Sequence, residues 1–240
     1  MFPRQRVGIS IGNDIAVQLA KSGAKVVGIA RTKDLLDKLK SENPSIETIE
    51  HDITDWKKTE QVITKLGPVD LLVNSAGLGW VKPMTEMVEK DYDELRLFIF
   101  TLNTKALINI TRLVVKDLLC RKAPGAIVNL SSQASLAGLL NHTVYCASKA
   151  AVDGFTRAVA LEYGPYNIRI NTVNPTVIMT DMGRMAWSDP KVGGPMLDKI
   201  PLKRFGEVRD VTDAVLYLLS DKAAMITGHC LPIDGGFISS

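Results

Sequence analysis

Residues 126–149 read AIVNLSSQASLAGLLNHTVYCASK, and this stretch holds the unit from which the fold is built. It begins with AIVNLS, a mostly apolar run of strand length, and ends in a helical pattern that continues to residue 163. A buried strand followed by a helix is the repeating unit of parallel sheets. The same alternation recurs along most of the chain.

This alternation predicts an α/β fold with a doubly wound, Rossmann-type parallel sheet. Further apolar runs of strand length lie at 24–29, 46–50, 69–74 and 168–173. Helical patterns lie at 12–22, 33–41, 56–66, 90–119, 143–163 and 207–220. Near-continuous apolar strands indicate a sheet covered on both faces, with right-handed crossovers. Because no repeat or linker divides the chain, we expect a single domain over residues 1–240.

Composition excludes several classes of protein. Of the 240 residues, 46% are hydrophobic and 23% charged, which argues against disorder, coiled coil and collagen. The net charge is only +3 and basic residues form no run, so we expect no nucleic-acid partner. Three cysteines and three histidines, without metal-ligand spacing, predict no metal site and no disulfide framework. We also expect no transmembrane segment and a cytoplasmic location.

Tyr145 and Lys149 are the sharpest candidates for chemistry. At i and i+4 they share one face of a helix, and an ammonium near the phenol lowers its pKa from about 10. Ser132 follows an apolar strand at its carboxyl end, where open parallel sheets place ligands. The pattern YxxxK alone is weak, because a tyrosine and a lysine on a helix are more often a packed ring and a solvated charge.

Several further motifs occur in register with this pair. They are Asn74-Ser-Ala76-Gly77, Asn103 in Leu-Asn-Thr-Lys, Asn129-Leu-Ser-Ser132, Asn174-Pro175 and Asp234-Gly235-Gly236. Together they resemble the short-chain dehydrogenase/reductase family over about nine-tenths of the chain. The resemblance implies that Tyr145 protonates a carbonyl oxygen during hydride transfer, Lys149 lowers its pKa and holds the nicotinamide ribose, and Ser132 orients the substrate. It assigns Asn103 to a water in a proton relay.

The resemblance extends to one branch of the family. The stretches that carry it are 67–74, 131–133, 141–146, 174–177 and 187–190. This branch implies NADPH-dependent reduction of L-xylulose and small α-dicarbonyl compounds by a cytosolic homotetramer. It also places a set of residues at the wall of the substrate pocket: Ser132, Gln133, Leu139, His142, Trp187 and Met196. A structural histidine and ordinary loop packing of Trp187 are the alternatives.

The choice of cofactor can be argued from charge. No carboxylate stands at the end of the run 24–29, where NAD enzymes hold the ribose hydroxyl, whereas Arg31 can pair with a 2′-phosphate. This favours NADPH, with a solvated arginine as the alternative. The family pattern implies a set of cofactor contacts: Gly12, Arg31, Thr32, Asp52, Asn74, Ala76, Gly77, Tyr145, Lys149, Val177 and Thr180.

Two departures from the family pattern complicate these expectations. In the glycine-rich turn that holds the pyrophosphate, Gly12 keeps its place, but Gln5, Arg6 and Ser10 replace the expected threonine and two glycines. The first, central strand also looks truncated. About four residues look inserted near Phe98, which a helix can absorb as one extra turn. The alternatives are therefore a non-catalytic or cofactor-impaired variant, or a reductase for another ketone or steroid.

Overall fold

The structure is a computed structural model that describes residues 10–239. The chain divides into two compact units, which are described separately. The first comprises the chain up to His51, Pro175–Leu216 and the chain from Ile233 onward. The second comprises Asp52–Asn174 and Tyr217–Pro232. The predicted single domain over residues 1–240 stays a prediction.

In the first unit, helices alternate with a pair of parallel strands. The elements at its start are α1 (Ile11–Lys21), β1 (Val27–Ala30), α2 (Lys33–Glu42) and β2 (Glu47–Glu50). β1 pairs in parallel with β2, with Val27 opposite Glu47. The Ser10 hydroxyl caps α1 by accepting a hydrogen bond from the Asn13 amide at 3.3 Å. Later come α7 (Asp181–Trp187), α8 (Pro190–Leu197), most of α9 (Val208–Leu219) and a short helix at Phe237–Ser239.

The second unit is built on a four-stranded sheet with the order β3-β4-β5-β6. Its strands are β3 (Leu71–Asn74), β4 (Gly125–Leu130), β5 (Ile168–Pro175) and β6 (Cys230–Ile233), the last residues of β5 and β6 lying across the unit boundary. β3, β4 and β5 run parallel. Its longer helices are α3 (Trp56–Lys65), α4 (Glu89–Leu95), a π-helix (Arg96–Ala106), α5 (Leu107–Arg121) and α6 (Thr143–Tyr163). Short helices lie at Met84–Glu86, Gln133–Ser135, Gly164–Tyr166 and Asp221–Ala223.

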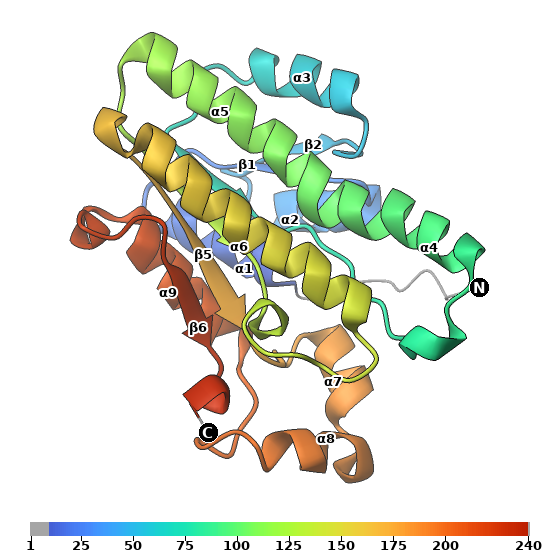
Figure 1. The fold of residues 1–240 in the computed structure, drawn as a ribbon. Coiled ribbons are helices and arrows are strands. Elements are labelled where there is room, and N and C mark those ends of the chain that lie inside the picture. The colour runs from blue at the N-terminus through green and yellow to red at the C-terminus, as the bar shows by residue number, and fades with distance from the viewer. Residues whose placement is uncertain (1–9, 240) are drawn as a thin grey trace. The chain divides into compact units, whose positions relative to one another are not determined.

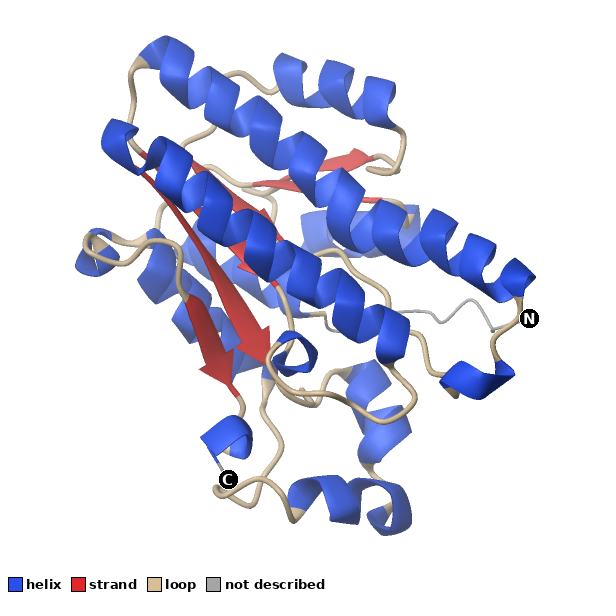
Figure 2. Cartoon of the chain, viewed as in Figure 1, coloured by secondary structure: helices blue, strands red, loops and turns tan. Residues whose placement is uncertain are grey.

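Helices α5 and α6 run side by side over one face of this sheet, as Figures 1 and 2 show. The central strands β4 and β5 are buried along almost their whole length, and Val128, Ile168 and Ile170 are fully enclosed. Leu118 from α5 also has no exposed surface. Burial on both faces agrees with the near-continuous apolar run of β4, whereas β5 also buries the polar residues Asn171, Thr172 and Asn174.

The helical stretch Phe98–Arg121 is long and apolar enough to cross a membrane by length and composition, with a mean hydropathy of 1.3. It is the one such stretch among the described residues, and 56% of it is buried inside the fold. That burial is typical of a core helix. The expected absence of a transmembrane segment stays a prediction.

The α/β architecture with parallel strands is confirmed, with three differences. The predicted helix over 90–119 is three segments, because an 11-residue π-helix lies between α4 and α5. This π-helix contains Phe98, so the helix around the predicted insertion has wider turns than the α-helix expected there. β6, α7 and α8 were not predicted. The degenerate glycine turn up to Ile9 and the truncated first strand lie outside the described residues.

Candidate active site

Four predicted catalytic residues lie in the second unit and come from three segments. Ser132 follows β4, Tyr145 and Lys149 lie on α6, and Asn103 lies in the π-helix. Ser132, Asn103 and Lys149 are 8%, 1% and 5% exposed. The α6 helix packs against both the π-helix and the short helix after Ser132, so its first turns bring these segments together at the carboxyl end of β4.

Tyr145 is held between Ser132 and His142. Burial raises the pKa of Tyr145, while a hydrogen bond with the Ser132 side chain acts in the opposite direction. The Ser132 oxygen also accepts a hydrogen bond from the Ala134 amide at 3.1 Å, which fixes its direction. The His142 ring meets the Tyr145 ring edge-on, with centroids 6.2 Å apart. The Ser132 and Tyr145 hydroxyls lie within hydrogen-bonding distance of each other, so both are near enough to bind one carbonyl oxygen.

Lys149 is a buried ammonium with a defined partner. Its Nζ donates a hydrogen bond to the Leu130 carbonyl at 2.8 Å and lies 5.9 Å from the centroid of the Tyr145 ring. Burial lowers the pKa of Lys149 to about 8, against a smaller opposite effect of Asp153. The sequence predicted that Lys149 would bring the pKa of Tyr145 below its usual value. That prediction is wrong for the net shift, because desolvation of the phenol outweighs the stabilising contacts.

Asn103 connects the loop after β3 to α6. Its Oδ1 accepts a hydrogen bond from the Leu78 amide at 2.8 Å, and its Nδ2 donates to the Leu78 carbonyl at 3.0 Å and to Ser148 Oγ at 3.1 Å. Both N–H donors are therefore used within the protein. A relay water held by this side chain would have to donate to Oδ1, and the relay role stays a prediction.

The loop after β3 fits a bound ribose. Its residues Ser75–Gly79 are exposed, although they lie beside the buried lysine. A Cβ added at Gly77 would lie 3.2 Å from Asn103 Oδ1 and 3.3 Å from Lys149 Nζ, so a side chain there would require both groups to shift slightly. Asn74 serves the sheet instead, because its Nδ2 donates to Asn129 at 2.8 Å and to Thr111 at 3.1 Å. Ala76 and Gly77 therefore remain the better cofactor candidates in this segment.

Gln133 is a buried polar group whose side chain has no hydrogen-bond partner within the described residues. Its side chain is 1% exposed, and within the described residues neither amide atom has a hydrogen-bond partner. A buried unpaired amide is costly unless a ligand pairs with it, which supports the predicted substrate role. His142 is already engaged, since its Nδ1 lies 2.7 Å from the Leu140 carbonyl. Leu139 lies nearby in sequence and is half-buried.

Most of the other predicted cofactor and substrate residues belong to the first unit. Gly12 lies in the first turn of α1, and Arg31 and Thr32 form the turn between β1 and α2. Val177 precedes α7, and Thr180 caps that helix by accepting a hydrogen bond from the Gly183 amide at 3.1 Å. Trp187 packs on Phe205 with ring centroids 6.2 Å apart, and Met196 lies in α8. Their predicted roles stay predictions.

Asp52 belongs to the second unit and forms a local turn. Its Oδ1 accepts hydrogen bonds from the Thr54 amide at 3.0 Å and the Thr54 hydroxyl at 2.7 Å. Its predicted contact with the adenine stays a prediction.

Sequence reasoning missed the partners that hold the catalytic residues. The Leu130 carbonyl, the Leu78 backbone and Ser148 all contact Lys149 or Asn103. Backbone groups leave no trace in the residue pattern, because every residue has them. Ser148 could have been found from its place one residue before Lys149, on the same helix.

Comparison with known proteins agrees with this geometry. The model of a family described as enoyl-(acyl carrier protein) reductase matches residues 7–238. The chain is 48% identical to L-xylulose reductase of Bos taurus, over 97% of this chain and 94% of that protein. It is 44% identical to D-erythrulose reductase of Gallus gallus, over 97% and 93%. A solved NAD(P)-dependent gluconate 5-dehydrogenase from Beutenbergia cavernae, with bound NADP, superposes with a TM-score of 0.87 at 30% identity, over 96% and 93%.

The buried ammonium makes stability depend on pH. Lys149 has a pKa of about 8 in the folded chain and 10.5 when unperturbed. Between these values the unfolded chain holds a proton that the folded chain has released, so stability rises with pH. The free energy of unfolding of the parent should therefore increase relative to that of Lys149→Met as pH rises from 8 to 10.5. Urea titrations of both proteins across this range check it, and a pH-independent difference would contradict the assignment.

Proposed function

The chain belongs to the short-chain dehydrogenase/reductase family, and on that premise we propose that it reduces L-xylulose and small α-dicarbonyl compounds with NADPH. The observation that carries this proposal is the arrangement of Ser132 and Tyr145 hydroxyls beside the buried ammonium of Lys149. The substrate class is supported by the relatives that reduce short ketoses and by the unpaired amide of Gln133.

In the proposed reduction, each catalytic residue of the second unit has a separate role. A bound NADPH would supply the hydride that the carbonyl carbon receives. Ser132 and Tyr145 donate hydrogen bonds to the carbonyl oxygen, and Tyr145 gives it a proton as negative charge develops there. Lys149 stabilises the resulting phenolate. Asn103 keeps the loop at Leu78 in place against α6. Gln133 pairs with a second oxygen of the substrate, which an α-dicarbonyl or a ketose provides.

The role of Tyr145 can be separated from substrate and cofactor binding. Tyr145→Phe removes only the hydroxyl, so NADPH binding should survive while turnover of diacetyl and L-xylulose falls by roughly 10²–10⁴, the range for a positioned acid. Fluorescence titration with NADPH and the rate of NADPH oxidation measure the two effects, with thermal unfolding as the folding control. Turnover close to that of the parent would show that the phenol is not the acid.

NADPH titration and turnover measurements on the parent also distinguish the proposed reductase from the two alternative functions. A bulky ketone or steroid reduced faster than L-xylulose would favour another family reductase. A parent chain that neither binds NADPH nor turns over would favour a cofactor-impaired variant, as the degenerate glycine turn suggests.

Preference for NADPH over NADH is assigned to Arg31. Arg31 is exposed in the turn between β1 and α2, directly before Thr32 at the start of that helix. A guanidinium at a helix N-terminus is well placed to bind a phosphate. Thr32 adds a hydroxyl, and its side chain makes no capping hydrogen bond to α2.

Reversing this charge should reverse the preference. Arg31→Asp should weaken NADPH binding by roughly 1.5–3 kcal/mol, the range for a charge-assisted hydrogen bond, and should leave NADH binding nearly unchanged. Titrating both cofactors into the parent and the variant gives the ratio, with Lys33→Asp in the first turn of α2 as a matched control. The assignment fails if Arg31→Asp keeps the parental ratio.

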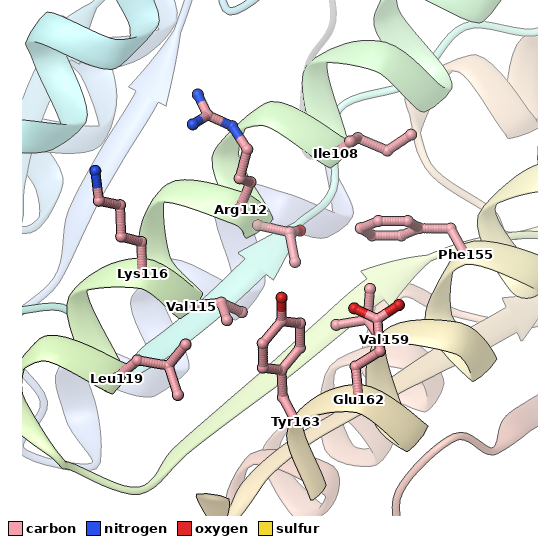
Figure 3. Close-up of a pocket in the computed structure, with 10 residues that line it drawn as sticks. Ile108, Arg112, Val115, Lys116, Leu119, Phe155, Val159, Glu162 and Tyr163 are labelled. Atoms are coloured by element: carbon pink, nitrogen blue, oxygen red, sulfur yellow. The ribbon is translucent and has the colours of Figure 1, made fainter.

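We also propose that the chain forms a homotetramer, and that α5 and α6 supply one of its interfaces. A hollow of about 370 Å³ lies between these helices, lined by Ile108, Val115, Leu119, Phe155, Val159 and Tyr163 (Figure 3). Arg112 and Lys116 on α5 and Glu162 on α6 also line it. A two-fold axis would bring Arg112 and Lys116 of one copy toward Glu162 of the other, which would make this face complementary to itself.

A charge placed in this hollow should break the interface. Phe155→Asp should lower the mass of the assembly measured by light scattering at micromolar concentration, because an unpaired carboxylate would be buried there. Leu140→Asp, on an 87% exposed side chain before α6, is the matched control and should assemble like the parent. A monomeric parent would count against the proposal.

A cytoplasmic location also stays a proposal. It is supported by the three cysteines, whose number and spacing predict no disulfide framework.

A further inference from the structure

Asp153 is a buried carboxylate that the mechanism above does not use. It lies on α6 one turn beyond Lys149 and is 2% exposed. Its Oδ2 accepts a hydrogen bond from Asn174 Nδ2 at 3.0 Å. The same nitrogen lies 3.3 Å from the Ser132 carbonyl and 2.8 Å from Ser135 Oγ. One amide group on β5 thus joins the carboxylate on α6 to the backbone of the segment that carries Ser132.

The charge of this carboxylate is only partly compensated by hydrogen bonds. Its Oδ1 has no hydrogen-bond partner among the described residues. Such a buried anion needs a cation nearby. On α6, Lys149 lies one turn before it and Arg157 one turn after it. Within the described residues, Asp153 interacts electrostatically with Lys149 and, from β6, with Cys230, to whose Sγ Arg157 Nη1 donates at 3.5 Å.

We propose that Asp153 is a positioning residue for the reaction, in which its charge keeps Lys149 as an ammonium and its hydrogen bond to Asn174 fixes the backbone at Ser132. The inference rests on the proposed reductase function, because it assigns Asp153 to the same site. Lys149 must be a cation to stabilise the phenolate that Tyr145 becomes when it gives up its proton. A buried ammonium readily loses its proton, and a carboxylate one helical turn away opposes that loss.

The electrostatics of the site agree with this assignment. The attraction of Asp153 raises the pKa of Lys149, and burial still brings that pKa down to about 8. Without the carboxylate, burial would act unopposed and the lysine would lose its proton at lower pH. Asp153→Asn is the variant that isolates this effect, because it keeps the acceptor for Asn174 and removes only the charge.

The first test is the pH dependence of carbonyl reduction. In the parent the rate should fall as pH passes about 8, where Lys149 loses its proton. In Asp153→Asn this fall should move about one pH unit lower, which makes the variant roughly tenfold slower than the parent at high pH and nearly equal at low pH. Asn174→Ala, which breaks the link to Ser132 and keeps the charge, should lower kcat at every pH without moving the profile. An unmoved profile in Asp153→Asn overturns the proposal.

The second test does not depend on activity. Thermal unfolding of the parent, Asp153→Asn, Lys149→Met and the double variant forms a cycle at neutral pH. If the charge of Asp153 compensates the charge of Lys149, Asp153→Asn should lower the Tm of the parent. In the Lys149→Met background the same substitution should leave Tm unchanged or raise it. An equal loss in both backgrounds overturns the proposal, even if Asp153→Asn alone barely folds. Because the cycle needs no substrate, it decides the inference whether or not the chain proves to be a reductase.

Discussion

The hydrogen bond from the Lys149 ammonium to the Leu130 carbonyl is the contact on which the site depends. It joins α6 to the carboxyl end of β4 through the Lys149 ammonium. In an exposed lysine this group is solvated by water, and here burial lowers its pKa. The glycine at residue 77, the amide of Asn103 and the carboxylate of Asp153 all lie around this one charge. The Leu130 carbonyl of β4 fixes the position of the Lys149 ammonium, and the surrounding polar groups offset the cost of burying its charge.

Much of the fold followed from hydrophobic pattern, because the central strands are buried on both faces. β4 appears as a near-continuous apolar run, β5 as a run that Arg169 and Asn171 interrupt, and α6 ends where its pattern ends. β6 was missed because it has four residues and contains Pro232. α7 was missed because it has only seven residues, and α8 because Pro195 interrupts it. The residues of these two segments do not favour a helix. Both helices form with their first turns capped by the Thr180 and Asp189 side chains.

The site was predictable where a function depends on spacing along one helix, as it does for Tyr145 and Lys149. It was not predictable where a function depends on the dielectric environment or on backbone partners. The direction of the pKa shift of Tyr145 depends on how far the phenol is removed from water, which no spacing reveals. The unpaired amide of Gln133 was predicted as a substrate contact from resemblance, but only the burial around it gives a physical reason for that role.

The π-helix before α5 bears on how length varies in this part of the chain. Residues added to an α-helix usually rotate and shift everything that follows them. Here the predicted insertion near Phe98 falls within the π-helix Arg96–Ala106, and Asn103 in the same helix contacts Leu78 and Ser148. A π-helix holds more residues per turn than an α-helix, so residues can be added in this segment with less rotation and shift of α5 than an α-helix would require. A change of length before α5 would then disturb its buried face less than a change within it.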